Sequence, residues 1–425
     1  MTASARQEIA TLLRNRRPGF PLEAPFYVSP EVFALDLELI FARHWLHVAV
    51  EPEMAEPGDF ITVELGTASI ILLRDDDGQI RGFRNVCRHR GARLLTEPRG
   101  FVGNLVCPYH NWTYDLSGRL VHAGIMGRDF DPTCLGLKPV AVRCIEGLVF
   151  ACLAEDPPAD IEEMAADVSP YLAPHNIANL KLAHQSELIE NGNWKLVMEN
   201  NRECFHCANH PELLRSYPHL TAVGAQAVTA EERADYEAFQ RLHGEFEAIW
   251  EAQSLPWRAI EKLDGRPTGY RTQRLALDGA GESFTLDARA ACAKPTGRFT
   301  SPRLGSLHLH TQPNSWNHFL GDHAVVFSVF PVAPDKTLVR SRWLVAKDAV
   351  EGIDYDLSRL TEVWNATNAQ DASFVGWAQA GAADPAYVPG PFAPAEYQVN
   401  SFDNWYVERM IAGLEGPARA RLAAE

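Results

Sequence analysis

The chain has 425 residues and a formal net charge of −16, from 39 lysines and arginines against 55 aspartates and glutamates. Hydrophobic residues make up 46% and charged residues 22%, which excludes a wholly disordered or fibrous chain. The acidic balance argues against nucleic acid or an anionic membrane surface as the main partner, since phosphate contacts need clustered lysines and arginines. At about 150 residues per domain, the length predicts two or three domains.

The first part of the chain predicts helices followed by a small β-domain. Residues 1–45 carry apolar side chains at mixed helical spacing, and we expect this helical segment to pack on the last domain. In residues 46–155, short apolar runs such as 60–63 and 70–73 alternate with turns, which is typical of an all-β domain. Two prolines within residues 155–158 indicate a linker at its end.

Residues 160–425 predict a second domain of mixed composition. The pattern is mostly helical over 160–260 and returns to strands over 302–347, where two apolar runs flank a turn at 333–336 and predict an antiparallel pair. Two further helices are expected, over residues 350–382 and 405–424. The fold class that follows is α+β.

The cysteines and the apolar runs indicate the compartment. No run reaches the roughly 18–20 residues of a membrane span, and no apolar secretory segment is visible, so we expect a cytoplasmic protein without a membrane partner. The eight cysteines form no dense framework, and two pairs of them lie near histidines. In a reducing compartment this pattern predicts metal binding rather than disulfides.

The first candidate metal site lies in the β-domain. Cys87 and His89 are followed by seventeen residues and then by Cys107 and His110, so that each of two loops supplies one thiolate and one imidazole. A Rieske [2Fe–2S] centre needs two cysteines on one iron and two histidines on the other. A zinc site is the alternative, but zinc fingers usually pair cysteine with cysteine and histidine with histidine.

The second candidate site follows in the C-terminal domain. Glu203, His206 and His210, together with Asn200, have spacings that would place them on one face of a helix. Two histidines four residues apart can bind one metal, and a carboxylate from elsewhere would complete a 2-His-1-carboxylate site on ferrous iron with open positions for O2. The alternative is a polar helix face whose histidines are already hydrogen-bonded.

Two cysteines lie inside this second segment. Cys204 and Cys207 have the spacing of half a zinc ribbon, but the chain offers no matching second pair. We interpret them as small buried residues near the site.

At this point the motifs resemble a known family. Residues 87–91 and 107–114 resemble the Rieske motifs of the non-haem iron oxygenase alpha subunits in order, spacing and flanking residues. Residues 199–207, and the tail segments 387–391 and 405–406, resemble the branch that acts on quaternary ammonium compounds. That branch includes glycine betaine monooxygenase, proline betaine (stachydrine) demethylase and carnitine monooxygenase. The resemblance extends from about residue 20 to 412.

The resemblance implies an architecture and a set of roles. An N-terminal all-β Rieske domain would precede an antiparallel-sheet helix-grip catalytic domain, in a homotrimer. Glu203, where many members have aspartate, would bridge His206 to the cluster ligand His110 of the partner subunit. The third ligand beside His206 and His210 would be Asp371, which lies in the matching segment 368–375, with Asp322 as the alternative. Many members space the two histidines one residue further apart.

The implied activity is O2- and NAD(P)H-dependent N-demethylation of a quaternary ammonium compound, which releases formaldehyde. No G-x-G-x-x-G motif follows a strand, so the electrons must enter from a separate flavin and iron–sulfur reductase. The cofactors would be a [2Fe–2S] cluster, Fe(II) and O2. Ring hydroxylation or O-demethylation of an aromatic acid is the alternative within the family, and a zinc-binding structural or interaction protein is the alternative outside it.

Aromatic side chains are the expected partners of such a substrate. A trialkylammonium group has no N–H to donate, so it is best held by aromatic faces, at roughly 0.5–2 kcal/mol for each contact. Each candidate could equally be a core aromatic. The candidates near the predicted iron segments are Phe205, Trp316, Phe319, Trp364 and Trp377.

Overall fold

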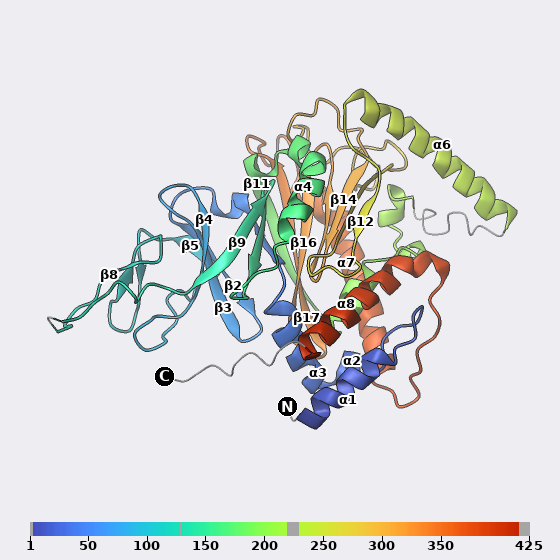
Figure 1. Cartoon of the computed structure of the whole chain (residues 1–425). Helices are drawn as coiled ribbons and strands as arrows, with labels where there is room; N and C mark the ends of the chain where they lie inside the picture. Colours follow the sequence, from blue (N-terminus) through green and yellow to red (C-terminus); the bar gives the residue numbers. More distant parts are fainter. Residues whose placement is uncertain (1–2, 128, 219–228, 416–425) are drawn as a thin grey trace.

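Two large antiparallel sheets organise the chain (Figure 1). The computed structural model describes residues 3–127, 129–218 and 229–415. Within these ranges each of the two sheets has seven strands, and a third sheet has three. None of the helices in the same ranges combines the length and the apolar character that crossing a membrane requires.

The N-terminal segment is helical and packs against the end of the chain. α1 (Ala3–Arg14) runs along α8 (Tyr397–Glu415). It is followed by α2 (Pro25–Val28), α3 (Pro30–Leu35) and a π-helical turn, η1 (Asp36–Phe41). Ser29 begins α3 because its hydroxyl accepts the N–H groups of Glu31 and Val32. α8 starts before the predicted residue 405, and residues 416–424 lie outside the described part of the chain.

The first sheet and the three-stranded sheet form the β-domain at the left of Figure 1. The runs 60–63 and 70–73 lie inside paired strands, as their alternation predicts. A two-residue turn at Glu146 and Gly147 closes the last hairpin with φ of 47° and 92°, a conformation that suits the twist of such hairpins. The elements are β1 (Leu46–Val50), η2 (Glu51–Met54), β2 (Asp59–Leu65), β3 (Ala68–Arg74), β4 (Ile80–Arg84), β5 (Arg99–Phe101), β6 (Leu105–Val106), β7 (Thr113–Tyr114), β8 (Leu120–His122), β9 (Pro139–Ile145) and β10 (Leu148–Cys152).

The second sheet forms the centre of the C-terminal domain, in the order β11-β17-β16-β15-β14-β13-β12. Its strands are β11 (Leu180–Glu190), β12 (Ile260–Lys262), β13 (Tyr270–Leu275), β14 (Ser306–Thr311), β15 (Ser315–Phe319), β16 (Ala324–Ala333) and β17 (Lys336–Ala346). The helical elements are α4 (Ile161–Leu172), η3 (Ala173–His175), η4 (Ile177–Asn179), α5 (Trp194–Asn200), η5 (Cys207–Asn209), η6 (Leu213–Arg215), α6 (Ala230–Ala252), α7 (Leu357–Ala382) and η9 (Pro394–Glu396).

One prediction for this domain is wrong, and another is confirmed. Residues 180–190 form a strand inside the stretch predicted to be mostly helical. β11 pairs with β17 from Leu180 to Glu190. The hydrogen bonds between these two strands outweigh the weak preference of the local sequence for a helix. The expected antiparallel pair around the turn at 333–336 is present as β16 and β17.

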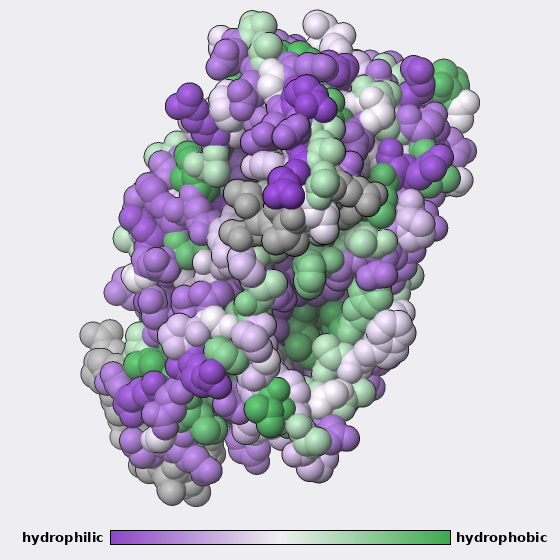
Figure 2. Space-filling view, turned by 90° about the vertical axis from the view of Figure 1, so that its right-hand side faces the viewer, coloured by the Kyte–Doolittle hydropathy of each residue, from purple (hydrophilic) through white to green (hydrophobic). Residues whose placement is uncertain are grey.

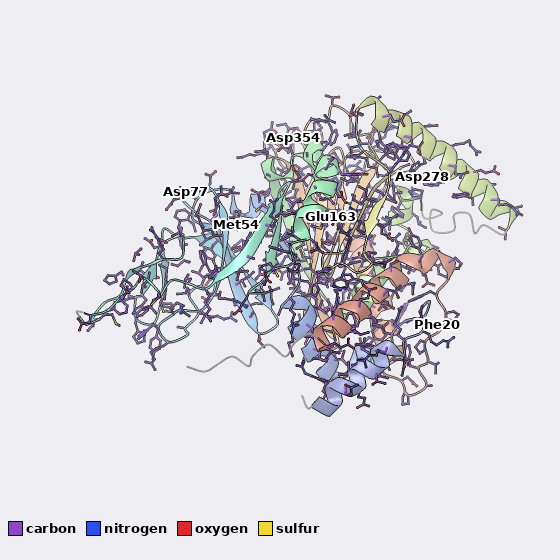
Figure 3. The ribbon with its side chains drawn as sticks, in the orientation of Figure 1. Phe20, Met54, Asp77, Glu163, Asp278 and Asp354 are labelled. Atoms are coloured by element: carbon purple, nitrogen blue, oxygen red, sulfur yellow. A yellow bond between two sulfur atoms is a disulfide. The ribbon has the colours of Figure 1, made fainter. Side chains whose placement is uncertain are left out.

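The two faces of the second sheet have different neighbours. One face packs against α4 and the first sheet, in a core that includes Phe150, Val168, Leu309 and Phe319. Ion pairs support this layer: Glu163 of α4, labelled in Figure 3, bonds Lys262 at 2.7 Å and also Arg266. The opposite face is covered by α5 and α7, and this is where the candidate site lies.

A buried ionic cluster fixes α5 to the N-terminal segment. The Lys195 ammonium lies 2.5 Å from Asp36 Oδ2, and both side chains are fully buried. Trp194 Nε1 donates to the same oxygen at 2.9 Å, and the Tyr406 hydroxyl donates to Oδ1 at 2.7 Å. Breaking such a buried pair leaves an uncompensated charge and costs about 3–5 kcal/mol. The helix that leads into the metal site is therefore held in one position.

Glu199, at the end of α5, lies beside a second buried carboxylate. Tyr27 donates to Glu199 at 2.9 Å. Burial, followed by the nearby charge of Asp403, raises the pKa of Glu199 well above its usual range. The folded state therefore binds a proton that the unfolded chain releases at lower pH, so this group lowers stability as pH rises.

We therefore predict that Glu199→Gln flattens the pH dependence of stability. Glutamine copies the shape of the protonated acid and cannot ionise. The melting temperature of the unchanged chain should fall from mildly acidic to alkaline pH, and that of the variant should fall less. The difference between the two melting temperatures should therefore widen as pH rises. Thermal unfolding at several pH values measures this. Glu38→Gln, at an exposed glutamate, is the matched control, and parallel profiles of the Glu199 variant and the unchanged chain would contradict the prediction.

Candidate metal centres and substrate pocket

Cys87 and Cys107 begin two loops with the same hydrogen-bond pattern. The N–H of Gly91 donates to the Cys87 carbonyl and the N–H of Asn111 donates to the Cys107 carbonyl, both at 3.0 Å. In each loop the cysteine N–H then donates to the residue five positions on, at 2.8 Å. Both loops turn through a positive φ, 74° at Gly91 and 58° at Asn111, which glycine and asparagine adopt at low cost.

The loops bring the four predicted cluster ligands together. Cys87 and Cys107 are buried, at 2% and 1% exposure, whereas His89 and His110 are exposed. The two imidazole centroids are 4.6 Å apart, and Trp112 stacks on His89 at 4.7 Å. Sulfurs on the inside and imidazoles at the surface suit a two-iron cluster whose histidine-bound iron faces outward.

The sulfur environment also fits a metal cluster. Burial raises the pKa of Cys107, and the neighbouring Cys87 sulfur raises it further, so two thiolates at this spacing need a cation between them. The Tyr114 hydroxyl accepts the N–H of Arg88 at 3.0 Å and lies 3.3 Å from Cys87 Sγ, where it can donate to a bound thiolate. Such donors to sulfur tune a cluster's potential.

The second candidate site does not lie on one helix, and that prediction is wrong. α5 ends at Asn200, and only a short 3-10 turn forms further on. The reason is Glu203, whose carboxylate accepts the N–H groups of Phe205 and His206 that a continuing helix would direct to the carbonyls four residues earlier. The chain instead folds back as a loop over the second sheet.

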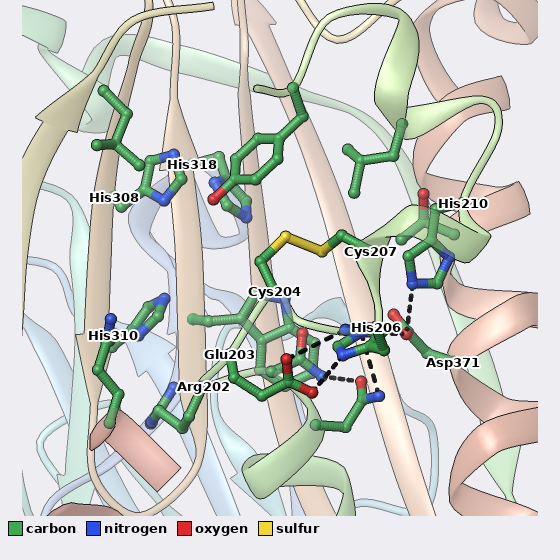
Figure 4. Close-up of a pocket in the computed structure, with 18 of the residues that line it drawn as sticks. Arg202, Glu203, Cys204, His206, Cys207, His210, His308, His310, His318 and Asp371 are labelled. Carbon is green, nitrogen blue, oxygen red and sulfur yellow. Dashed lines mark hydrogen bonds and ion pairs between the residues drawn. A yellow bond between two sulfur atoms is a disulfide. The ribbon is translucent and has the colours of Figure 1, made fainter. Parts of the chain in front are cut away.

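The loop still brings both histidines to one carboxylate (Figure 4). Asp371 Oδ1, from α7, lies 3.3 Å from His206 Nε2 and 3.2 Å from His210 Nε2. His206 Nδ1 donates to Glu203 at 2.5 Å, and His210 Nδ1 donates to Gln370 Oε1 at 2.7 Å. Both rings therefore have their Nδ1 engaged and direct Nε2 toward Asp371, as metal-binding histidines do. The four-residue spacing of the histidines is compatible with this convergence because no helix fixes their faces.

The electrostatics of this group favour a cation. Burial opposes protonation of His206, but the neighbouring carboxylates of Asp371 and Glu203 outweigh burial and raise its pKa to about 9. Burial likewise opposes ionisation of Asp371, yet the two imidazoles lower its pKa. The site therefore attracts positive charge, which a metal ion can supply in competition with protons.

Two buried atoms indicate that a metal fits here. His210 Nε2 and Asp371 Oδ1 have no hydrogen-bond partner among the described residues, and a metal between them would satisfy both. Cys207 also lies within 4.8 Å of the histidine ligand atoms, but its sulfur is bonded to Cys204 and offers no thiolate. Two imidazoles and one carboxylate form the donor set that ferrous iron oxygenases use.

The disulfide between Cys204 and Cys207 contradicts the prediction of metal binding rather than disulfides for this pair, and it corrects the interpretation of the two cysteines as small buried residues near the site. Cys204 and Cys207 have Cα atoms 4.8 Å apart, within the range that a disulfide spans. The short loop after α5 brings them together, and sequence spacing alone did not reveal this.

The alternative ligand Asp322 is not near the histidines. It is fully buried elsewhere, where it accepts hydrogen bonds from Ser283 at 3.0 Å and from the N–H of Ala291 at 2.7 Å. It does not line the pocket beside His206 and His210, which removes it as the third ligand.

A cavity of about 370 Å³ lies beside the triad, between α7 and strands β13–β15. Strand register places Arg271 opposite His310, and His310 opposite Trp316, in one row across the sheet. A second row on the same face holds Gln273, His308 and His318. Figure 2, which views the molecule from the right-hand side of Figure 1, shows a hollow in that side of the molecule with hydrophobic residues gathered in it.

The five aromatic candidates for the pocket separate into two groups. Trp316 and Trp364 line the cavity. Phe319 does not, because alternation along β15 turns it to the opposite face, into the core with α4. Phe205 and Trp377 are 62% and 69% exposed and lie outside the lining. The assignment of these last three residues to the pocket is therefore corrected.

Sequence reasoning missed most of the polar lining. The histidines of β14 and β15 alternate with apolar residues, which was a usable signal that they share one face of a strand. The sequence marks Arg202 as a site residue only by its position beside Glu203. It marks Gln370 only by its position beside Asp371. The missed residues are Arg202, Arg271, His308, His310, His318 and Gln370.

Two family models match separate parts of the chain. Residues 44–136 match the Rieske [2Fe-2S] domain. Residues 177–412 match the ring hydroxylating alpha subunit (catalytic domain).

Several relatives match nearly the full length. The chain is 45% identical over 419 residues to the glycine betaine monooxygenase oxygenase subunit of Chromohalobacter salexigens, which covers 98% of this chain and 92% of that protein. It is 42% identical over 426 residues to the protein of the same name from Pseudomonas aeruginosa, and the match covers 99% of this chain and 96% of that protein. A solved quaternary ammonium Rieske monooxygenase in complex with gamma-butyrobetaine has the same fold, with a TM-score of 0.67 at 21% identity over 94% of this chain and 98% of that one.

We predict that Asp371→Asn removes the single iron and spares the cluster. An amide cannot supply the negative charge that the two imidazoles leave uncompensated on a ferrous ion. Iron content should fall from about three to about two atoms per chain, with acid-labile sulfide and the visible spectrum unchanged. Asp335→Asn, at an exposed turn aspartate, is the control. Full iron occupancy in the Asp371 variant would contradict the assignment.

Proposed function

The chain belongs to the family of ring-hydroxylating oxygenase alpha subunits that carry a Rieske [2Fe–2S] domain, and we propose that it is the oxygenase component of a multicomponent monooxygenase that demethylates a quaternary ammonium compound of the glycine betaine type. The observation that carries the proposal is the identity of 45% over nearly the whole chain with a glycine betaine monooxygenase oxygenase subunit. Neither ring hydroxylation nor a zinc-binding structural role is favoured by that match.

The pocket supports a cationic substrate. Burial lowers the pKa of His308 to about 3 and that of His318 well below its usual value, so both imidazoles are neutral aromatic rings at physiological pH. His318 stacks on Trp364 with centroids 4.5 Å apart, which extends this aromatic wall. Neutral aromatic faces attract a trialkylammonium group, whereas protonated imidazoles would repel it.

The residues of the two centres have complementary roles in this proposal. Cys87, His89, Cys107 and His110 would hold the cluster, while His206, His210 and Asp371 would hold the iron. When bound, the cluster supplies electrons one at a time and the iron supplies oxidative chemistry with O2. The protein positions the substrate's methyl group beside the triad and restricts water through the buried lining. Overall, the methylated ammonium compound, O2, NAD(P)H and a proton give the demethylated amine, formaldehyde, NAD(P)+ and water.

The placement of the two centres supports electron transfer between subunits. In Figure 1 strand β8, which follows the second cysteine–histidine loop, lies at the far left of the molecule, whereas α7, which carries Asp371, packs on the second sheet. On one surface, the exposed ring of Tyr109 covers His110. On a second surface, exposed Phe205 lies two residues from Glu203 in the chain. Exposed Trp377 contacts Phe374, which in turn contacts His206. We infer that these two apolar surfaces meet in a homotrimer, where Glu203 bridges His206 to His110 of the partner subunit.

The reducing partner is a separate protein in this proposal. It would be an NAD(P)H-dependent reductase with flavin and iron–sulfur groups, since the chain offers ligands for the cluster and the iron but no nicotinamide motif. A supply of NAD(P)H is consistent with a cytoplasmic location.

The proposed activity predicts formaldehyde release from glycine betaine. The purified protein, loaded with iron and cluster and supplied with such a reductase and NADH, should consume O2 and NADH and release formaldehyde and dimethylglycine in equal amounts. Formaldehyde, O2 and amine are measured in parallel, with a panel of aromatic acids as competing substrates. A hydroxylated aromatic product, with no turnover of any quaternary ammonium compound, would contradict the proposed function.

Glu203→Gln should slow electron transfer without removing either metal centre. The amide keeps the size of the side chain but loses the charge that holds the His206 N–H, so we expect turnover to fall about 10- to 100-fold. Stopped-flow oxidation of the reduced cluster should slow by a similar factor, while iron and sulfide contents stay unchanged. Glu251→Gln, at an exposed glutamate, is the control. Cluster oxidation at the unchanged rate in the Glu203 variant would exclude the bridging role.

A further inference from the structure

Arg202 is a buried guanidinium that forms no ion pair among the described residues. Only 3% of the residue is exposed, and it lines the cavity beside the triad. One of its nitrogens donates to Gln312 at 2.5 Å, but Nε and Nη1 have no hydrogen-bond partner among the described residues. Burying an unpaired charge with unmet hydrogen bonds is costly, so such a group is expected to have a partner that the chain itself does not provide.

Other deeply buried arginines of the chain show the contrast. Arg342 pairs with Glu53 at 2.8 Å, and Arg16 pairs with Asp403 at 3.1 Å. Arg274, like Arg202, forms no ion pair among the described residues, but it donates to the carbonyls of Pro256 and Tyr171 and does not line the pocket. Arg202 forms no ion pair within the part of the chain that the structure describes. The guanidinium therefore keeps free N–H groups, on Nε and Nη1, that can donate to an anion.

The surroundings of Arg202 add positive charge and hydrogen-bond donors. Arg271 and Arg202 are close enough to lower the pKa of His310, after the effect of burial, so this end of the pocket is cationic. Arg271 forms an ion pair with Glu261 at 2.9 Å, whereas Glu261 acts on Arg202 without forming an ion pair with it. In Figure 4, Arg202 and His310 lie on one side of the pocket, and His210 and Asp371 lie on the other.

We propose that Arg202 binds the carboxylate of the substrate and thereby directs its trialkylammonium end to the aromatic wall and the triad. This inference rests on the proposed function and names the residue that recognises the carboxylate of a substrate of the glycine betaine type. A zwitterion matches the cavity at both ends: its anion meets the free guanidinium, and its cation meets the neutral rings of His318 and Trp364 and the carboxylates near the iron site.

The proposal makes Arg202 a specificity-determining residue. A site built to bond a charged group discriminates strongly against analogues without it, because its own buried donors are then left unpaired. Choline and other carboxylate-free quaternary ammonium compounds should therefore be poor substrates. Loss of a hydrogen bond to a charged group corresponds to a factor of about 10–100 in kcat/KM.

The first test compares two substrates of almost the same shape. Glycine betaine and its neutral carboxamide differ only in the group that would meet Arg202. With the unchanged, fully loaded enzyme and its reductase, kcat/KM from formaldehyde release should favour glycine betaine by about 10-fold or more. Equal values for the two substrates would overturn the inference while leaving the proposed demethylase function intact. Turnover of neither compound, nor of any other quaternary ammonium compound, would instead sink the proposed function.

The second test changes the residue. Arg202→Gln should reduce the preference for glycine betaine over the carboxamide by about 10-fold or more, mainly through a higher KM for glycine betaine. Arg202→Lys, which keeps the charge but not the fork, should retain part of the preference. Arg274→Gln is the matched control, because Arg274 is equally buried but lies outside the pocket lining.

The ratio of the two substrates separates a binding role from a structural one. A variant that is merely less stable loses activity toward both compounds equally and keeps its preference. If Arg202→Gln keeps the full preference, the carboxylate does not bind there. If Arg202→Gln fails to fold, the Arg202→Lys variant still tests the residue, and equal kcat/KM values for the two substrates with the unchanged enzyme would still overturn the inference.

Discussion

The contact of one carboxylate with two imidazoles organises the C-terminal domain. Asp371 comes from α7, whereas His206 and His210 come from a loop after α5, so the site exists only where these elements meet over the second sheet. Each histidine is held through its other nitrogen, by Glu203 and Gln370. Burying a carboxylate against two imidazole nitrogens is unfavourable unless a cation binds between them. Binding of a cation at this site therefore stabilises the folded domain.

The rest of the chain keeps these elements in register. The buried Lys195–Asp36 pair fixes α5 to the N-terminal helical segment, which in turn packs on α8. On the other side of the second sheet, α4 and the first sheet fill the face that does not carry the pocket. The β-domain thus supports the catalytic sheet from behind, while its own cluster loops lie remote from the triad. This separation of the two centres within one chain is the reason for proposing that Glu203 acts as a bridge between subunits.

Sequence patterns predicted the features that depend on local spacing. The two cysteine–histidine loops, the turn between β16 and β17 and the helix that carries Asp371 all follow from residues close together in the chain. Predictions failed where distant contacts decide: β11 is a strand because β17 pairs with it, and α5 stops because Glu203 competes for backbone N–H groups. Phe319 was misplaced because the face it presents depends on strand register, which its aromatic character does not reveal.

The arrangement of charge in the pocket explains how an acidic chain can handle a zwitterion. A cation alone would be attracted to Glu203 and Asp371 in any orientation, because the whole protein is negative. Arg202, adjacent to Glu203 in the chain, adds a buried positive charge that, unlike Arg271, has no ion pair among the described residues, and this makes the two ends of the cavity different. The imidazoles of His308 and His318 are neutral, so they do not reduce the difference in charge between the two ends of the cavity. Orientation of the substrate then follows from two consecutive residues of opposite charge, one directed to the pocket and the other bonded to the iron-site histidine.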